Sequence, residues 1–157
     1  MTDTDKKNAR YSRIYDQLEP LMQKTTEPVS RMATITALLH HKMNYFFWTG
    51  FYLLHSDNSL LVGPYQGALA CLSLPAGKGV CWAGILEKKT VIVPNVHEFP
   101  GHIICNSRSC SEIVVPLFDK YGAIKGVMDV DSDKYGAFDD TDAEWLERIV
   151  LFLKESL

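Results

Sequence analysis

The chain has 157 residues, of which 46% are hydrophobic and 22% are charged, and its formal net charge is −3. This composition fits one folded domain with a buried core. The slightly negative charge argues against nucleic-acid binding, and no run of roughly eighteen apolar residues could cross a membrane. The N-terminal segment lacks the apolar block of a signal peptide, so we expect a cytoplasmic protein.

Two helices are predicted over residues 1–43. Tyr11, Ile14 and Leu18 recur at helical spacing in the first, which Pro20 should kink or end. Pro28 suits the first turn of the second helix. Its inward-facing residues are expected to be Val29, Met32, Ile35, Leu38, Leu39 and Met43.

Residues 44–132 should form a sheet and the loops of a site. Aromatic and β-branched residues fill 45–54 and 60–65 on either side of turn residues, which predicts a hairpin. A second hairpin is predicted over 112–132. Between the hairpins we expect a strand or an extended loop at 67–74, a short helix at 80–87 and a short strand at 90–93.

The last predicted element is a helix over 139–156, which begins with a run of acidic residues. Hairpins with helices at both ends of the chain indicate an α+β fold. In such a fold helices flank a central, mainly antiparallel sheet.

Carboxylates are expected to gather on one face of this sheet. Successive side chains of a strand point to opposite faces, so Asp129 and Asp131 lie on the same side of theirs. The partner strand can bring Glu112 to them. Clustered acids repel one another, so a site that keeps them commonly holds a cation, for which a substrate ammonium group would suffice. The alternative is three separately solvated acids.

Trp48 and Tyr52 lie four residues apart on the first strand and therefore face the same side. They could form the wall of an apolar pocket. As large aromatic residues they could equally well belong to the core.

The loop at 97–111 is rich in Pro, Gly, Ser and Asn and carries Cys105 and Cys110. Such loops often carry function, although these cysteines could simply fill space. A redox-active Cys105 would need a second thiol to resolve its sulfenic acid, and Cys71, Cys81 and Cys110 are all candidates. Together with His97 and His102 the cysteines could also bind zinc, but the paired spacings of structural zinc sites are missing, so we expect no metal.

Several motifs together carry a resemblance to a known family. They are FWTGFY at 47–52, GPYQG at 63–67, AC at 70–71, GKGVC at 77–81, NVH at 95–97, GHI at 101–103 with Cys105, SEIV at 111–114 and DVDS at 129–132. In this combination the chain resembles the free methionine-(R)-sulfoxide reductases, a GAF-domain family. The resemblance covers nearly the whole chain after the first helix and implies a single GAF domain over residues 1–157.

The resemblance also implies an activity. Cys105 would attack the sulfoxide sulfur of free methionine (R)-sulfoxide, and Cys71 would resolve the sulfenic acid as a disulfide, with Cys81 as second candidate. The substrate-binding residues would be Trp48, Tyr52, Glu112, Asp129 and Asp131. No cofactor would be bound, and thioredoxin with NADPH would supply the electrons.

Two positions depart from the family pattern. Asn106 stands where Asp is common, and Cys110 stands where a polar residue is common, which leaves the disulfide pairing open. The sequence does not determine the oligomeric state, so a homodimer also stays open. A GAF module that binds a small ligand without catalysis is the alternative function, and the absence of an output domain after Leu157 argues against it.

Overall fold

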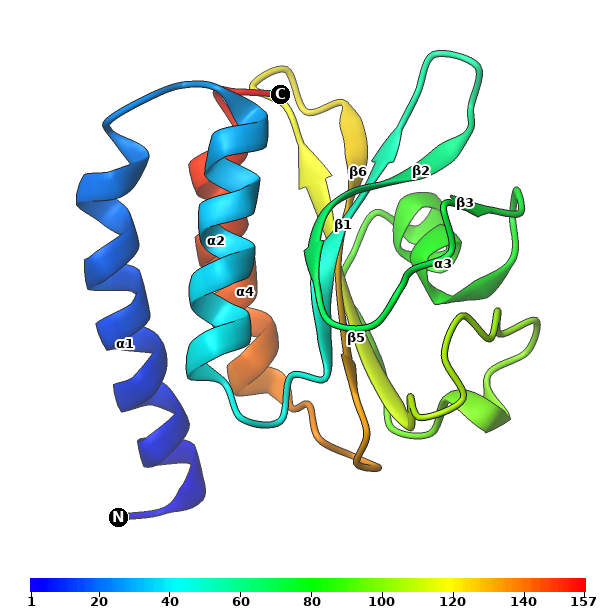
Figure 1. Cartoon of the computed structure of the whole chain (residues 1–157), viewed down its shortest axis with the longest axis horizontal. Helices are drawn as coiled ribbons and strands as arrows, with labels where there is room; N and C mark the ends of the chain where they lie inside the picture. The colour runs from blue at the N-terminus through cyan, green and yellow to red at the C-terminus, as the bar shows by residue number, and fades with distance from the viewer.

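A six-stranded antiparallel sheet with helices on both faces organises the computed structural model, which describes all 157 residues (Figure 1). Helices α1, α2 and α4 lie on one side of the sheet, while α3 and the long loops lie on the other. None of the helices combines the length and the hydrophobicity that crossing a bilayer requires.

Helix α1 spans Asp3–Met22 and begins at a capping box, in which Thr2 and Asp5 exchange hydrogen bonds. Pro20 lies in its last turn, where the missing N–H leaves the carbonyl of Asp16 without its helical donor, and the helix ends two residues later at Met22. Helix α2 spans Pro28–Lys42 and has its proline in the first turn, as predicted.

Both predicted hairpins are confirmed. Strands β1 (Trp48–Leu54) and β2 (Leu60–Gln66) pair antiparallel, as do β5 (Ser111–Phe118) and β6 (Ile124–Ser132). The hairpins join through β1 and β6, which gives the order β3-β2-β1-β6-β5-β4. The predicted α+β fold with an antiparallel sheet is therefore confirmed.

The middle of the chain is less regular. Only β3 (Ser73–Leu74) forms a strand in the segment after β2, and residues 67–72 form no helix or strand. Helix α3 (Gly79–Glu87) and strand β4 (Val91–Val93) follow. A 3-10 turn at Val96–Glu98, which the sequence did not indicate, leads into the cysteine loop.

The C-terminal helix α4 spans Asp140–Val150 and continues as a 3-10 turn at Leu151–Leu153, where we expected one helix over 139–156. Its buried Asp142 accepts hydrogen bonds from Tyr11, Tyr45 and Lys7. These contacts tie α4 to α1 and to the start of the sheet.

Two cores lie on opposite faces of the sheet, and β6 contributes to both. Met128 and Val130 join the core beneath α1, α2 and α4, whereas Val127 joins the smaller core beneath α3. The predicted alternation in β6 is confirmed. Asp129 therefore faces the side that carries α3 and the long loops.

Candidate active site

Strand register brings the predicted acids together. Glu112 on β5 lies directly opposite Asp131 on β6, and Asp131 lies opposite Trp48 on β1. One row further along β6, Asp129 lies opposite Gly50. Because paired residues point to the same face, the acids and the Trp48 indole share one side of the sheet.

Gly50 makes room for the aromatic wall. A Cβ atom at this position would lie 2.7 Å from Cη2 of Trp48 and 2.4 Å from Cβ of Tyr65. In the space that a side chain would fill, Trp48 stacks between two tyrosines, with ring centroids 5.3 Å from Tyr65 and 5.8 Å from Tyr52. A flat apolar surface thus stands beside the carboxylates.

The carboxylates are shielded from water. Glu112 is 6% exposed and Asp129 is 5% exposed, while Asp131 is partly buried. Burial, with the neighbouring Asp129 and Asp131, raises the pKa of Glu112 well above its usual range. Burial raises the pKa of Asp129 to about 6, although Glu112 and Cys81 offset part of the rise. Burial, followed by the charge of Asp129, also raises the pKa of Asp131.

Asp129 also carries an unsatisfied atom. Its Oδ1 is buried and has no hydrogen-bond partner. A buried carboxylate oxygen without a donor raises the free energy of the folded chain.

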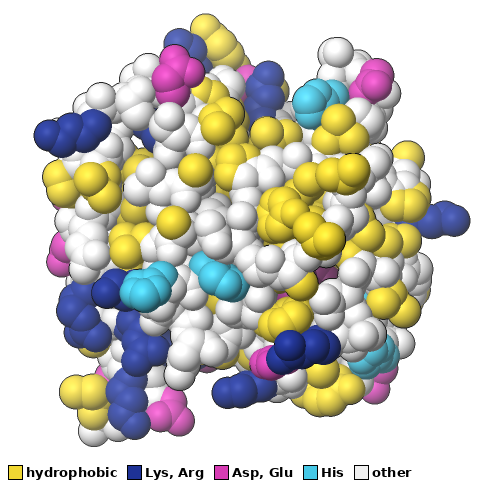
Figure 2. All heavy atoms as spheres, viewed as in Figure 1, with side chains coloured by type: hydrophobic (Ala, Val, Ile, Leu, Met, Phe, Trp, Pro, Cys, Tyr) yellow, Lys and Arg dark blue, Asp and Glu magenta, His cyan; other side chains and the backbone are white.

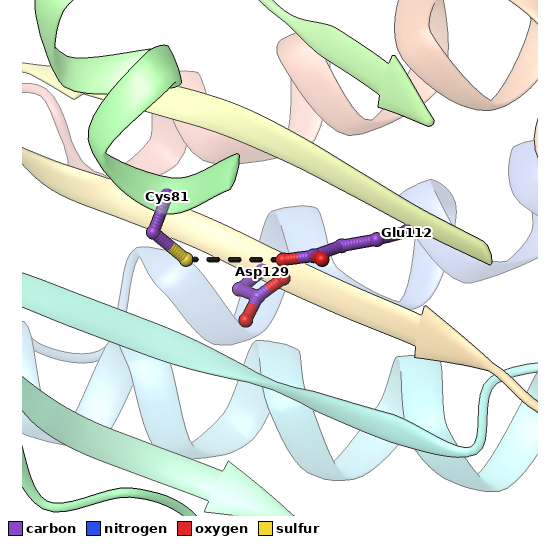
Figure 3. A group of neighbouring side chains, drawn as sticks. All are labelled: Cys81, Glu112 and Asp129. Atoms are coloured by element: carbon purple, nitrogen blue, oxygen red, sulfur yellow. Dashed lines mark hydrogen bonds between the residues drawn. The ribbon is translucent and has the colours of Figure 1, made fainter. Parts of the chain in front are cut away.

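Cys81 and His102 adjoin the acids. The Cys81 thiol projects from α3 toward Glu112, with 4.0 Å between Sγ and Oε1 (Figure 3). Burial, with the charges of Asp129 and Glu112, raises the pKa of this thiol. On the other side of Glu112, His102 Nε2 lies 3.8 Å from Oε2, and burial and His97 lower the pKa of His102.

A disulfide joins Cys71 to Cys105, with 5.4 Å between the two Cα atoms. The aromatic wall holds the segment that carries Cys71. The Tyr52 hydroxyl donates to the carbonyl of Cys71, and the Trp48 indole N–H donates to the carbonyl of Ala68. These contacts draw the segment over the acids, and the pocket beneath has a volume of about 50 Å³.

Cys110 lies outside this pocket. Its Sγ is 3.6 Å from the carbonyl oxygen of Arg108, and its backbone N–H donates to Ser132. The nearby Cys110 thiol raises the pKa of Tyr135. Cys110 is thus a free thiol that faces a different environment from that of Cys81.

A family model described as "GAF domain" matches residues 34–151. The chain belongs to the GAF domain family. It is also 44% identical to "GAF domain-containing protein A" of Dictyostelium discoideum, over 94% of this chain and 92% of that protein.

Some of the similar GAF proteins have a named activity. "Free methionine-R-sulfoxide reductase" of Escherichia coli is 38% identical over 94% of this chain and 88% of its own length. The crystal structure of the Neisseria meningitidis protein of the same name, in complex with its substrate, is 39% identical and superposes with a TM-score of 0.88. That match covers 93% of this chain and 87% of the other. The predicted membership in this reductase family is confirmed.

The GAF fold gathers the predicted site residues around one pocket. Trp48, Tyr52, Cys81, Cys105, Glu112, Asp129 and Asp131 line it, and Cys71 joins it through the disulfide. A zinc site built from all four cysteines is excluded in this form, because two of them are bonded to each other.

His102 and Ser109 line the pocket but were not predicted from the sequence to do so. His102 lines the pocket beside Glu112, although we had weighed it only as a zinc ligand. Its position three residues before Cys105 was the available signal. Ser109 also lines the pocket and is 6% exposed, and nothing in the sequence distinguished it from other loop serines.

Proposed function

We propose that the protein reduces free methionine (R)-sulfoxide to methionine, with Cys105 as nucleophile and Cys71 as resolving cysteine. The observation that carries the proposal is the Cys71–Cys105 disulfide beside a pocket with an aromatic wall and buried acids. The similarity to reductases, one of them solved with its substrate, supports the same activity.

The acids give the pocket its selectivity for a free amino acid. Asp129 is proposed to accept the substrate ammonium group through its unpartnered Oδ1, with Asp131 as a second acceptor. Trp48 and Tyr52 would enclose the methyl and sulfoxide end of the side chain. A peptide-bound methionine sulfoxide has an uncharged nitrogen at this point, which would leave the buried carboxylate unpaired.

The two electrons come from the cysteines, so the reaction needs no bound cofactor. The Cys105 sulfur attacks the sulfoxide sulfur and takes over its oxygen, which releases methionine and leaves a sulfenic acid. The Cys71 thiol then attacks the Cys105 sulfur, and the oxygen leaves as water when the disulfide forms. Glu112 is proposed to deliver a proton to the sulfoxide oxygen, since burial and the neighbouring Asp129 and Asp131 raise its pKa and so favour its protonated form.

Cys81 is proposed not to form the first disulfide. It lies on a helix rather than on a loop, it is 4% exposed, and burial with nearby acids keeps it protonated. A thiol attacks as the thiolate, so Cys81 is a poorer resolving group than Cys71. Its proposed part is to shape the floor of the pocket.

Thioredoxin is proposed to reduce the disulfide. Cys105 is exposed, as thiol–disulfide exchange requires. Beside the bond, Leu72 is 77% exposed and Ile104 is 67% exposed. Hydrophobic side chains gather on the molecular face that carries the segment between β2 and α3 (Figure 2). An apolar surface next to the target bond suits a protein reductant better than a small thiol.

Steady-state kinetics with the separate R and S epimers of free methionine sulfoxide test the proposal. We expect turnover of the R epimer, little turnover of the S epimer, and none of an N-acetylated R sulfoxide. Cys105→Ser should abolish turnover, while Cys110→Ser should retain it. Activity that survives Cys105→Ser would refute the proposed nucleophile.

Two further expectations concern the whole protein. A cytoplasmic location suits a cycle that depends on a reducing compartment, and cell fractionation tests it. A homodimer stays a prediction, which light scattering of the purified chain would check.

A further inference from the structure

We propose that Cys81, Glu112 and Asp129 form a binding site for a thiophilic divalent cation such as Zn²⁺, and that the ion blocks the pocket. The three side chains come from α3, β5 and β6 and point toward one another (Figure 3). Their ligand atoms all lie within 4.8 Å of one another.

The spacing is close to that of a metal site. Ligands of Zn²⁺ at about 2.3 Å for sulfur and 2.0 Å for oxygen, in tetrahedral geometry, stand about 3.5 Å apart. Sγ of Cys81 and Oε1 of Glu112 are 4.0 Å apart, so small rotations of the side chains would close the site.

An independent observation points to a missing ligand. Asp129 is 5% exposed, its carboxylate belongs to the converging group, and its buried Oδ1 has no hydrogen-bond partner. No lysine or arginine forms an ion pair with Glu112 or Asp129. A divalent cation would satisfy this oxygen and would replace the protons that Cys81 and Glu112 carry in the empty site.

A thiolate with two carboxylates suits Zn²⁺ and not Mg²⁺, because hard cations avoid sulfur. His102 lies on the far side of Glu112, with Nε2 3.8 Å from Oε2, and does not belong to the converging group. The fourth position of a tetrahedral ion would therefore be taken by water. Binding would release the Cys81 proton to the solvent.

The consequence for activity rests on the proposed function. The ion would occupy the carboxylates that are proposed to bind the substrate ammonium group, so it would compete with substrate. Metal binding itself does not depend on that proposal, because the site persists when Cys71 and Cys105 are locked in their disulfide.

The experiment uses oxidised full-length Cys110→Ser protein, in which Cys81 is the only free thiol. Co²⁺ is added as a spectroscopic probe, and Zn²⁺ binding is measured by equilibrium dialysis. We expect one bound ion, a thiolate-to-cobalt charge-transfer band in the near ultraviolet, and no displacement by excess Mg²⁺.

Two double variants, each built on the Cys110→Ser protein, assign the ligands. Adding Cys81→Ser should abolish the band, and adding Asp129→Asn should weaken Zn²⁺ binding more than about tenfold. Absence of the thiolate-to-cobalt band in the Cys110→Ser protein would overturn the proposal, whether or not the two double variants fold. Unchanged Zn²⁺ affinity after Cys81→Ser would overturn it as well. Neither result depends on whether the protein reduces methionine sulfoxide.

Discussion

Replacing Asp129 by Asn should weaken substrate binding and at the same time stabilise the free protein. Burial raises the pKa of Asp129 from 3.8 to about 6, so ionising this group costs more in the folded than in the unfolded chain. At about 1.4 kcal/mol per pH unit, the cost reaches about 3 kcal/mol above pH 6. It is absent below pH 3.8, where the group is protonated in both states.

The stability of the wild type should therefore fall as pH rises. As pH rises from about 4 to 6, the wild type should lose up to about 3 kcal/mol of unfolding free energy that Asp129→Asn retains. Urea unfolding of both oxidised proteins, in buffer with a metal chelator, measures the difference at each pH. Asp16→Asn, on the exposed side of α1, is the matched control and should show no such trend.

The same substitution should reduce kcat/KM for free methionine (R)-sulfoxide by roughly a hundredfold, because a buried ammonium group loses its charged partner. A stability difference that does not change with pH would refute the burial argument. A variant with unchanged kcat/KM would refute the proposed role of Asp129 in binding.

Three further substitutions probe other parts of the site. Glu112→Gln should lower kcat by roughly 100-fold with little change in KM, because the proton donor is lost. Gly50→Ala should destabilise the fold by about 1–3 kcal/mol in thermal unfolding, because its Cβ would lie 2.7 Å from the Trp48 ring. Ile104→Ser should raise KM for thioredoxin and leave turnover driven by dithiothreitol unchanged, because only a protein reductant would contact this side chain.

Matched controls separate these effects from general damage. Gly63→Ala, where Cβ would lie 3.3 Å from the flexible Leu53 side chain and at an ordinary 3.5 Å from the Phe51 carbonyl oxygen, should cost less than Gly50→Ala. Leu86→Ser, at an equally exposed leucine on α3, should leave thioredoxin kinetics unchanged. If Glu112→Gln keeps full kcat, proton delivery has another source. If Ile104→Ser slows turnover equally with thioredoxin and with dithiothreitol, Ile104 acts in the pocket rather than in the docking of thioredoxin.

The sheet could be predicted because its hairpins carry local signals. Turn residues separate two β-rich runs in each case, and alternation in β6 assigns Asp129 to one face without knowledge of the rest of the fold. Glu112 could be placed beside Asp131 because a short turn fixes the register of the second hairpin.

The loops over the pocket could not be predicted in the same way. Residues 67–72 have no regular hydrogen bonding, and their course depends on contacts with Trp48 and Tyr52, which lie about twenty residues away. The burial of Cys81 likewise follows from the packing of α3 on β5 and β6. Local sequence does not encode such distant contacts, so Cys71, Cys81 and Cys110 were equivalent until the resemblance and the structure separated them.

A single turnover tests the central claim most directly. Fully reduced protein is mixed with one equivalent of free methionine (R)-sulfoxide, alkylated, digested and analysed for disulfides by mass spectrometry. We expect one equivalent of methionine, a Cys71–Cys105 disulfide, and Cys81 and Cys110 alkylated as free thiols. A disulfide between Cys105 and Cys110, or methionine formed without loss of any thiol, would contradict it.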